Sequence, residues 1–154
     1  MTPNSPDVHH KFMKEALKEA HAAAAKGEVP VGAIVVCQNR IIARAYNLTE
    51  TLQDPTAHAE MQAITSATHA IGGKYLPDCT LYVTLEPCSM CAAALRWAQL
   101  GQLVYGASDP KQGYCTISQK LLPPKTEVIA GILEQECAQI IKVFFAKKRE
   151  GTIR

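Results

Sequence analysis

The sequence predicts an α/β protein, a three-layer α/β/α sandwich around a mixed five-stranded sheet. Segments with apolar residues at helical spacing alternate with short apolar runs of strand length, a pattern typical of helices that cover a sheet. The first two strands are separated only by a tight turn, so we expect them to be antiparallel. Helical crossovers join the later strands, and such connections favour parallel neighbours.

The chain has 154 residues and a mass of 16.7 kDa, which fits one ordinary domain. Hydrophobic residues make up 47% and charged residues 19%, a balance that excludes a disordered chain. We expect a flexible N-terminal tail over residues 1–10 and a single domain over residues 11–150. No apolar run approaches a membrane span of about 20 residues, and the first residues lack the apolar core of a secretory signal. We therefore expect a cytoplasmic protein with no membrane partner.

The first expected elements are a helix and a hairpin. Residues 7–26 place apolar residues at helical spacing, and Gly27 is a suitable end for that helix. Residues 31–37 form a continuous apolar run, which is typical of a strand covered on both faces. A tight turn at Asn39-Arg40 leads into a second strand over residues 40–46.

Two further helices are expected to begin at prolines. Asp54-Pro55 and Glu86-Pro87 each place an acidic residue before a proline, and proline in the first helical turn loses no hydrogen bond. The first of these helices ends at Gly72-Gly73, and the second covers residues 88–99. The strand over residues 80–85 lies between them.

The C-terminal part adds two strands and a helix. A strand over residues 102–107 is followed by an irregular segment over residues 110–125 and a weak strand over residues 127–130. The last helix covers residues 132–149, with acidic residues at its start and basic residues at its end, as the helix dipole favours. Its apolar face consists of Leu133, Cys137, Ile140, Ile141 and Phe144.

Basic charge is concentrated at the C-terminus, although the whole chain carries a net charge of only +2. Residues 141–154 hold five basic residues against one acidic residue, and Lys147, Lys148 and Arg149 are consecutive. These charges can meet phosphates of a nucleic acid. They can equally be a solvated helix end that complements the dipole, and both interpretations stay open.

The cysteines give one pair at the spacing of metal ligands. A cytosolic chain keeps its thiols reduced, so an even count of six is no evidence for disulfides. Cys37 and Cys137 are interpreted as small core residues. Only Cys88 and Cys91 lie three positions apart, at the start of an expected helix, where their sulfurs share one face.

A histidine completes a candidate metal site. His58 falls in the first turn of the helix opened by Pro55, and the strand over residues 80–85 separates that helix from the one that carries Cys88 and Cys91. Both helix N-termini can therefore meet at one edge of the sheet. One histidine and two cysteines are three ligands suited to zinc, and they leave a fourth position for water, as in catalytic sites.

Glu60 is the candidate catalytic residue. It lies two residues beyond His58, so its side chain should reach the rim of the site without binding the metal. Two thiolates neutralise the formal charge of zinc, which makes a nearby base useful for taking a proton from water. A closed structural zinc site with a fourth cysteine, a redox-active cysteine pair and a merely solvated glutamate stay open as alternatives.

At these residues the sequence resembles the zinc-dependent nucleobase deaminases of the cytidine deaminase superfamily. The narrower resemblance is to the bacterial tRNA adenosine deaminases, and it runs from about Phe12 to Arg149. The segments that carry it are Glu28–Ala33, Asn47, Asp54–Glu60, Thr80–Cys88, Met90–Ala92, Gly106-Ala107 with Asp109, and Gly131–Leu133 with Glu136-Cys137.

The resemblance implies one zinc ion per subunit on His58, Cys88 and Cys91, with attack of hydroxide on C6 of adenine and proton transfer by Glu60. It implies a homodimer that acts on a tRNA anticodon stem-loop, where it converts the wobble adenosine to inosine and releases ammonia. The residues implied to bind the substrate are Asn47, Ala59, Val31, Pro30 and Asp109.

Two other classes of function stay open. A deaminase of a free base or nucleoside, such as guanine, would share the zinc chemistry, and Trp97 resembles a position in the guanine enzymes. The segment Glu28–Val31 favours the tRNA enzymes, whereas Ser108 and residues 113–118 depart from their pattern. A non-catalytic zinc or RNA-binding module would have no need of Glu60.

Overall fold

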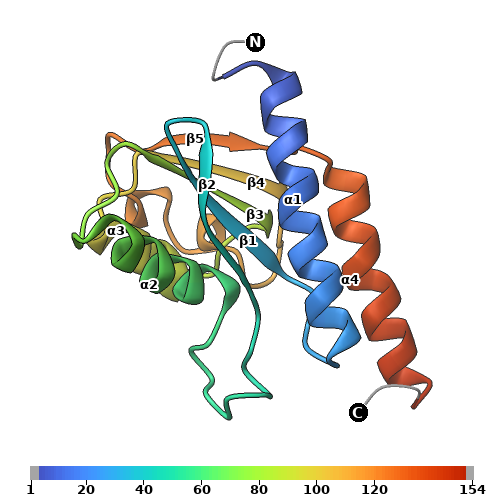
Figure 1. Cartoon of the computed structure of the whole chain (residues 1–154). Helices are drawn as coiled ribbons and strands as arrows, with labels where there is room; N and C mark the ends of the chain where they lie inside the picture. The colour runs from blue at the N-terminus through green and yellow to red at the C-terminus, as the bar shows by residue number, and fades with distance from the viewer. Residues whose placement is uncertain (1–3, 152–154) are drawn as a thin grey trace.

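The computed structural model describes residues 4–151 and has three layers (Figure 1). A five-stranded sheet in the order β2-β1-β3-β4-β5 is covered by α1 and α4 on one face and by α2 and α3 on the other. The elements in chain order are α1 (Pro6–Ala25), β1 (Gly32–Cys37), β2 (Arg40–Tyr46), α2 (Ala59–Ile71), β3 (Cys79–Leu85), α3 (Ser89–Trp97), β4 (Gln102–Ala107), the short 3-10 helices η1 (Tyr114–Thr116) and η2 (Gln119–Leu121), β5 (Glu127–Ala130) and α4 (Glu134–Arg149).

The strand pairing confirms the predicted mixed sheet. β1 is antiparallel to both β2 and β3, whereas β3, β4 and β5 are parallel to one another. β1 is buried on both faces, because Ile34 packs in the cluster beneath α1 and α4 while Ala33 and Val35 pack in the cluster beneath α2 and α3. This double burial is the reason for the continuous apolar run in the sequence.

Helices α2 and α3 begin later than the positions of Pro55 and Pro87 predicted. Residues 54–57 form a turn in which the Asp54 carboxylate accepts hydrogen bonds from the Thr56 amide, at 2.8 Å, and from its hydroxyl, at 2.7 Å. The helix therefore begins at Ala59, and His58 is its N-cap residue. In the same way, Cys88 is the N-cap residue of α3. Both residues have extended backbone angles, as is typical of N-cap positions.

The expected boundary of the N-terminal tail is wrong. Helix α1 begins at Pro6, and the Ser5 hydroxyl accepts a hydrogen bond from the Val8 amide at 3.3 Å. Residues 6–10 therefore belong to the helix, and two of them, Val8 and His9, are buried. Residues 1–3 of the expected tail lie outside the described residues.

The hairpin turn lies one residue earlier than expected. Gln38 and Asn39 have φ angles of 50° and 64°, and Cys37 pairs with Arg40 across the turn. Two consecutive residues with positive φ match a type I′ turn, whose twist suits a two-residue hairpin. Arg40 is consequently the first residue of β2 and not part of the turn.

One pair of cysteines contradicts the expectation of reduced thiols. Cys37 and Cys79 face each other in the antiparallel register of β1 and β3, with Cα atoms 4.5 Å apart, and form a disulfide. The interpretation of Cys37 as a reduced core residue is therefore wrong. Cys137 is free and fully buried, as the sequence indicated.

Within residues 4–151, every helix is too short or too polar to cross a membrane.

Candidate active site

The predicted metal ligands meet at the carboxyl end of β3. His58 Nδ1 lies 3.6 Å from Cys88 Sγ and 3.5 Å from Cys91 Sγ. The three ligand atoms all lie within 4.8 Å of one another, and no other group of this kind occurs among the described residues. One ring nitrogen and two sulfurs at this spacing can hold a metal ion.

The helix starts favour negative charge at these sulfurs. Neither His58 nor Cys88 caps its own helix with a side-chain hydrogen bond, so the first amide groups of both helices keep their polarity directed at the site. Cys88 lies at the N-cap of α3 and Cys91 in its first turn. Helix N-termini stabilise thiolates, which are the form in which cysteine binds metals.

The three groups also shift one another's protonation. A hydrogen bond from Cys91 holds the pKa of the Cys88 thiol well below its usual range, and the same bond, together with burial, raises the pKa of Cys91. The hydrogen bond with Cys88 raises the pKa of His58. The protonation of the three side chains is therefore linked, and a cation that binds them would displace their protons.

Glu60 lies beside this group without belonging to it. Its side chain is only 4% exposed, and burial raises its pKa to about 7. A carboxyl group with a pKa near neutrality can both accept and release a proton, which is what a general acid-base catalyst requires. Glu60 lines the cavity beside this group, and the group that could hold a metal consists of His58, Cys88 and Cys91.

We call His58, Cys88 and Cys91 together the metal group. A cavity of about 240 Å³ opens onto this group. Four of the five residues predicted to bind substrate line it, whereas Pro30 is buried and is not part of its lining among the described residues. Asn47 is held by a 3.4 Å hydrogen bond from its Nδ2 to the Val29 carbonyl. The lining residues are Val29, Val31, Asn47, Thr49, His58, Ala59, Glu60, Leu85, Glu86, Cys88, Asp109 and Gln112.

A second hollow of about 690 Å³ continues from this cavity toward α4. It shares Val29, Leu85, Asp109 and Gln112 with the cavity. Its other side consists of residues that the sequence did not single out together, among them Lys111, Lys142, Phe145 and Arg149. We call this second hollow the α4 groove. Its lining combines apolar residues such as Val29, Leu85 and Phe145 with the basic residues Lys142 and Arg149.

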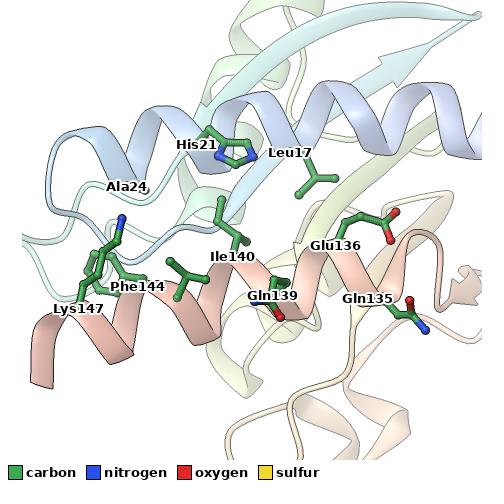
Figure 2. Close-up of a pocket in the computed structure, with 10 residues that line it drawn as sticks. Leu17, His21, Ala24, Gln135, Glu136, Gln139, Ile140, Phe144 and Lys147 are labelled. Atoms are coloured by element: carbon green, nitrogen blue, oxygen red, sulfur yellow. The ribbon is translucent and has the colours of Figure 1, made fainter.

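The three consecutive basic residues do not share one side of α4. Arg149 lines the α4 groove, next to the cavity. Lys147 instead lines a different hollow, between α1 and α4, where Figure 2 shows it beside Phe144 and across from Ala24. Lys148 is exposed between them. The expectation that all three bases form one RNA-contacting group is therefore too coarse, because consecutive helical residues point about 100° apart.

The fold and the site together define a deaminase. Residues 7–149 match the MafB19-like deaminase family, and the chain belongs to that family. The family resemblance inferred from the sequence is thereby confirmed.

Similar proteins indicate which kinds of deaminase this chain resembles. A protein of Bacillus subtilis called tRNA-specific adenosine deaminase is 47% identical over 144 residues, which cover 90% of this chain and 89% of that protein. A structure from a study of A-to-I editing by tRNA:A34 deaminases has a TM-score of 0.79 at 46% identity, covering 84% of this chain and 98% of that one. A guanine deaminase from Bacillus subtilis has a TM-score of 0.62 at 40% identity, over 65% of this chain and 64% of that one.

Proposed function

We propose that this protein hydrolyses the wobble adenosine of a tRNA anticodon to inosine and releases ammonia, with one zinc ion on His58, Cys88 and Cys91. The observation that supports the chemistry best is the joint placement of this group and the buried Glu60 around one cavity. The observation that supports the substrate is the similarity to proteins called tRNA-specific adenosine deaminases over nine-tenths of the chain.

The donor set fits zinc. Two thiolates and one imidazole nitrogen are ligands that zinc accepts in tetrahedral sites, and three protein ligands leave one position open. When bound, zinc supplies the Lewis acidity that makes a water molecule nucleophilic at neutral pH. The starts of α2 and α3 would hold the three ligands, and their amide dipoles favour the thiolate form in which cysteine binds zinc.

Glu60 carries the protons. In hydrolytic deamination, water adds to C6 of adenine, the ring nitrogen N1 takes a proton, and the amino group leaves as ammonia after taking another. A single carboxyl group beside the metal can accept the first proton from water and pass it to N1, and then accept the proton of the hydroxyl group added at C6 and pass it to the departing amine. Burial suits Glu60 to this task because its raised pKa lets it hold the proton between these steps.

The cavity orients one base. Asn47 offers an amide to the purine, and Val31 supplies an apolar wall against the ring. The backbone of Ala59 lies beside the base edge, because Ala59 follows His58 at the start of α2. Asp109 borders both the cavity and the α4 groove, so it stands where the ribose of an inserted nucleotide meets the flanking chain.

The α4 groove suits the nucleotides on either side of the reacting base. A target base must leave the stack to enter a cavity of this size, so its neighbours remain outside. Lys142 and Arg149 supply positive charge for phosphates, and Phe145, which is 36% exposed, offers a ring for stacking. A free base would make no use of this groove.

The resemblance supports the further proposal that the protein acts in the cytoplasm, where tRNA is found.

The resemblance also supports a homodimer. Trp97 and Ile117 are 81% and 68% exposed, and such exposed apolar side chains suit an interface with a second copy of the chain. Sedimentation of the purified protein tests the dimer, and a monomer at micromolar concentration would contradict it.

The second candidate function is deamination of a free base, which the 40% identity to a guanine deaminase over part of the chain favours. Ammonia release from an anticodon stem-loop, compared with release from guanine, adenosine and cytidine, separates the two. Turnover of the stem-loop alone supports the proposal. Turnover of guanine with none on the stem-loop would replace it with the alternative.

A further inference from the structure

Glu86 is a buried carboxylate that the proposed chemistry does not use. It directly follows β3 and is 5% exposed. Its Oε1 accepts a hydrogen bond from the Asp109 amide at 3.0 Å, and its Oε2 accepts one from the Cys115 amide at 3.0 Å. One carboxylate thus binds both ends of the loop over residues 109–115.

Backbone contacts bring the same loop against the start of α3. The Tyr114 amide donates to the Pro87 carbonyl at 2.8 Å, and Cys88 forms an isolated antiparallel bridge with Gly113. Within the loop, the Asp109 carboxylate accepts from the amides of Lys111 and Gln112. The loop is therefore a compact unit whose attachment to the rest of the molecule runs through the residues next to Cys88.

Gly113 shows that the loop is shaped around this carboxylate. A Cβ atom on Gly113 would lie 2.2 Å from Glu86 Oε2 and 2.5 Å from the Asp109 carbonyl oxygen. Its φ of −63° is open to any residue, so the glycine is needed for space and not for conformation. No other described glycine meets a carboxylate so closely.

The loop forms one wall of the reaction cavity. Asp109 and Gln112 line it together with Val31 and Asn47, and both also border the α4 groove. The metal ligands, by contrast, are held by α2 and α3. A shift of the loop would therefore change the space offered to the nucleotide while leaving the metal group in place.

We propose that Glu86 is a positioning residue that fixes the loop over residues 109–115 as the substrate-facing wall of the cavity, and so determines how tightly the nucleotide is bound. The inference rests on the proposed function for its kinetic part and on the contacts above for its structural part. A buried carboxylate that accepts two backbone N–H bonds forms charge-assisted bonds, which are stronger than neutral ones.

The test compares Glu86→Gln with the unaltered protein, both loaded with zinc. The glutamine has the same size, but its NH₂ group faces one of the two loop amides and loses that bond. We expect KM for the anticodon stem-loop to rise about ten- to a hundredfold, the effect of one charge-assisted bond, with a much smaller change in kcat. Glu127→Gln, on the exposed strand β5, is the control and should leave both constants unchanged.

Amide hydrogen exchange on the free protein gives a readout that does not depend on substrate. Exchange over residues 109–115 should speed up in Glu86→Gln. Glu28→Gln is the matched control, because the buried Glu28 carboxylate accepts backbone bonds from Glu50 and Thr51 in a different loop. Its effect should fall on residues 50–51 and spare residues 109–115.

The outcomes separate the two proposals. If the unaltered protein does not turn over the stem-loop, the proposed function fails, while the exchange data still test the loop contact. If it does, and Glu86→Gln keeps both its KM and its slow exchange, the inference is wrong. A fall in zinc content and kcat with unchanged KM would also overturn it, because Glu86 would then support the ligand Cys88. If Glu86→Gln does not fold, Gly113→Ala displaces the carboxylate from the loop side and must show the same rise in KM and in exchange.

Discussion

His58 Nδ1 lies 3.5 Å from Cys91 Sγ although 33 positions separate the two residues in the chain. The contact exists because α2 and α3 both begin near the carboxyl end of β3 and cover the same face of the sheet. Neither helix supplies all three candidate ligands. Binding of a metal ion therefore requires that the starts of both helices are in place.

The first prediction concerns the metal. Cys91→Ser should lower the zinc content of freshly purified protein from about one ion per chain to a small fraction, since a neutral hydroxyl is a poor substitute for a thiolate. Cys115→Ser is the control, because Cys115 is an exposed free cysteine outside the group. Elemental analysis measures both. Full zinc in Cys91→Ser would remove this residue from the ligand set.

The second prediction concerns proton transfer. Glu60→Gln should keep its zinc and its fold, because the amide has the size of the carboxyl group and Glu60 is not a ligand. It should lose about 10²–10⁴-fold in kcat, the usual contribution of general acid-base catalysis. Single-turnover rates on an anticodon stem-loop measure this loss. A variant with zinc bound and nearly full turnover would show that another group moves the proton.

The third prediction sorts the basic residues of α4. Arg149→Ala should weaken stem-loop binding and reduce its log–log salt slope by about 0.7–0.9, the share of one phosphate contact on a single strand or duplex. Lys148→Ala removes the same charge from the neighbouring position, which is exposed but does not line the α4 groove. Titrations at two salt concentrations compare them. Equal effects of both variants would mean that the groove does not receive the RNA.

The fourth prediction concerns a buried histidine far from the site. His9 Nδ1 is 2.8 Å from the Tyr82 hydroxyl, and its Nε2 has no hydrogen-bond partner among the described residues. Burial lowers the pKa of His9 below its usual 6.5, so below that pH the unfolded chain binds more protons than the folded one. Its contribution to stability is therefore present above about pH 6.5 and is lost as the pH falls.

His9→Gln removes this titration while keeping a polar group for Tyr82. The free energy of unfolding of the variant, measured by denaturant between about pH 7.5 and pH 5, should fall less steeply with decreasing pH than that of the unaltered protein. Both proteins carry the same metal group, so its own titration cancels in the comparison. Parallel curves would show that His9 does not titrate between the two states.

The strands could be predicted from the sequence because their signal is local. β2, β4 and β5 have the expected bounds, and β1 and β3 differ by one residue. The helix starts could not, because Pro55 opens a side-chain-stabilised turn and not the helix itself. The three candidate metal ligands could be predicted from the spacing of Cys88 and Cys91 together with a histidine at the start of another helix.

Other features required contacts between distant segments. The Cys37–Cys79 disulfide depends on strand register across 42 residues, and neither cysteine has a partner nearby in the sequence. The role of Glu86 depends on a loop that the sequence left irregular. The different sides of α4 on which Lys147 and Arg149 lie could have been predicted from the sequence. The helical period places the two residues differently relative to the buried Cys137 and Phe144.

Isotope labelling of the product tests the central claim most directly. An anticodon stem-loop with adenosine at the wobble position is incubated with the zinc-loaded protein in water enriched in ¹⁸O, and the product is analysed by mass spectrometry. Hydrolysis at C6 places one solvent oxygen on the base, so we expect inosine at the wobble position carrying ¹⁸O, with an equal amount of ammonia. An unmodified stem-loop, alongside deamination of guanine by the same preparation, would contradict the account.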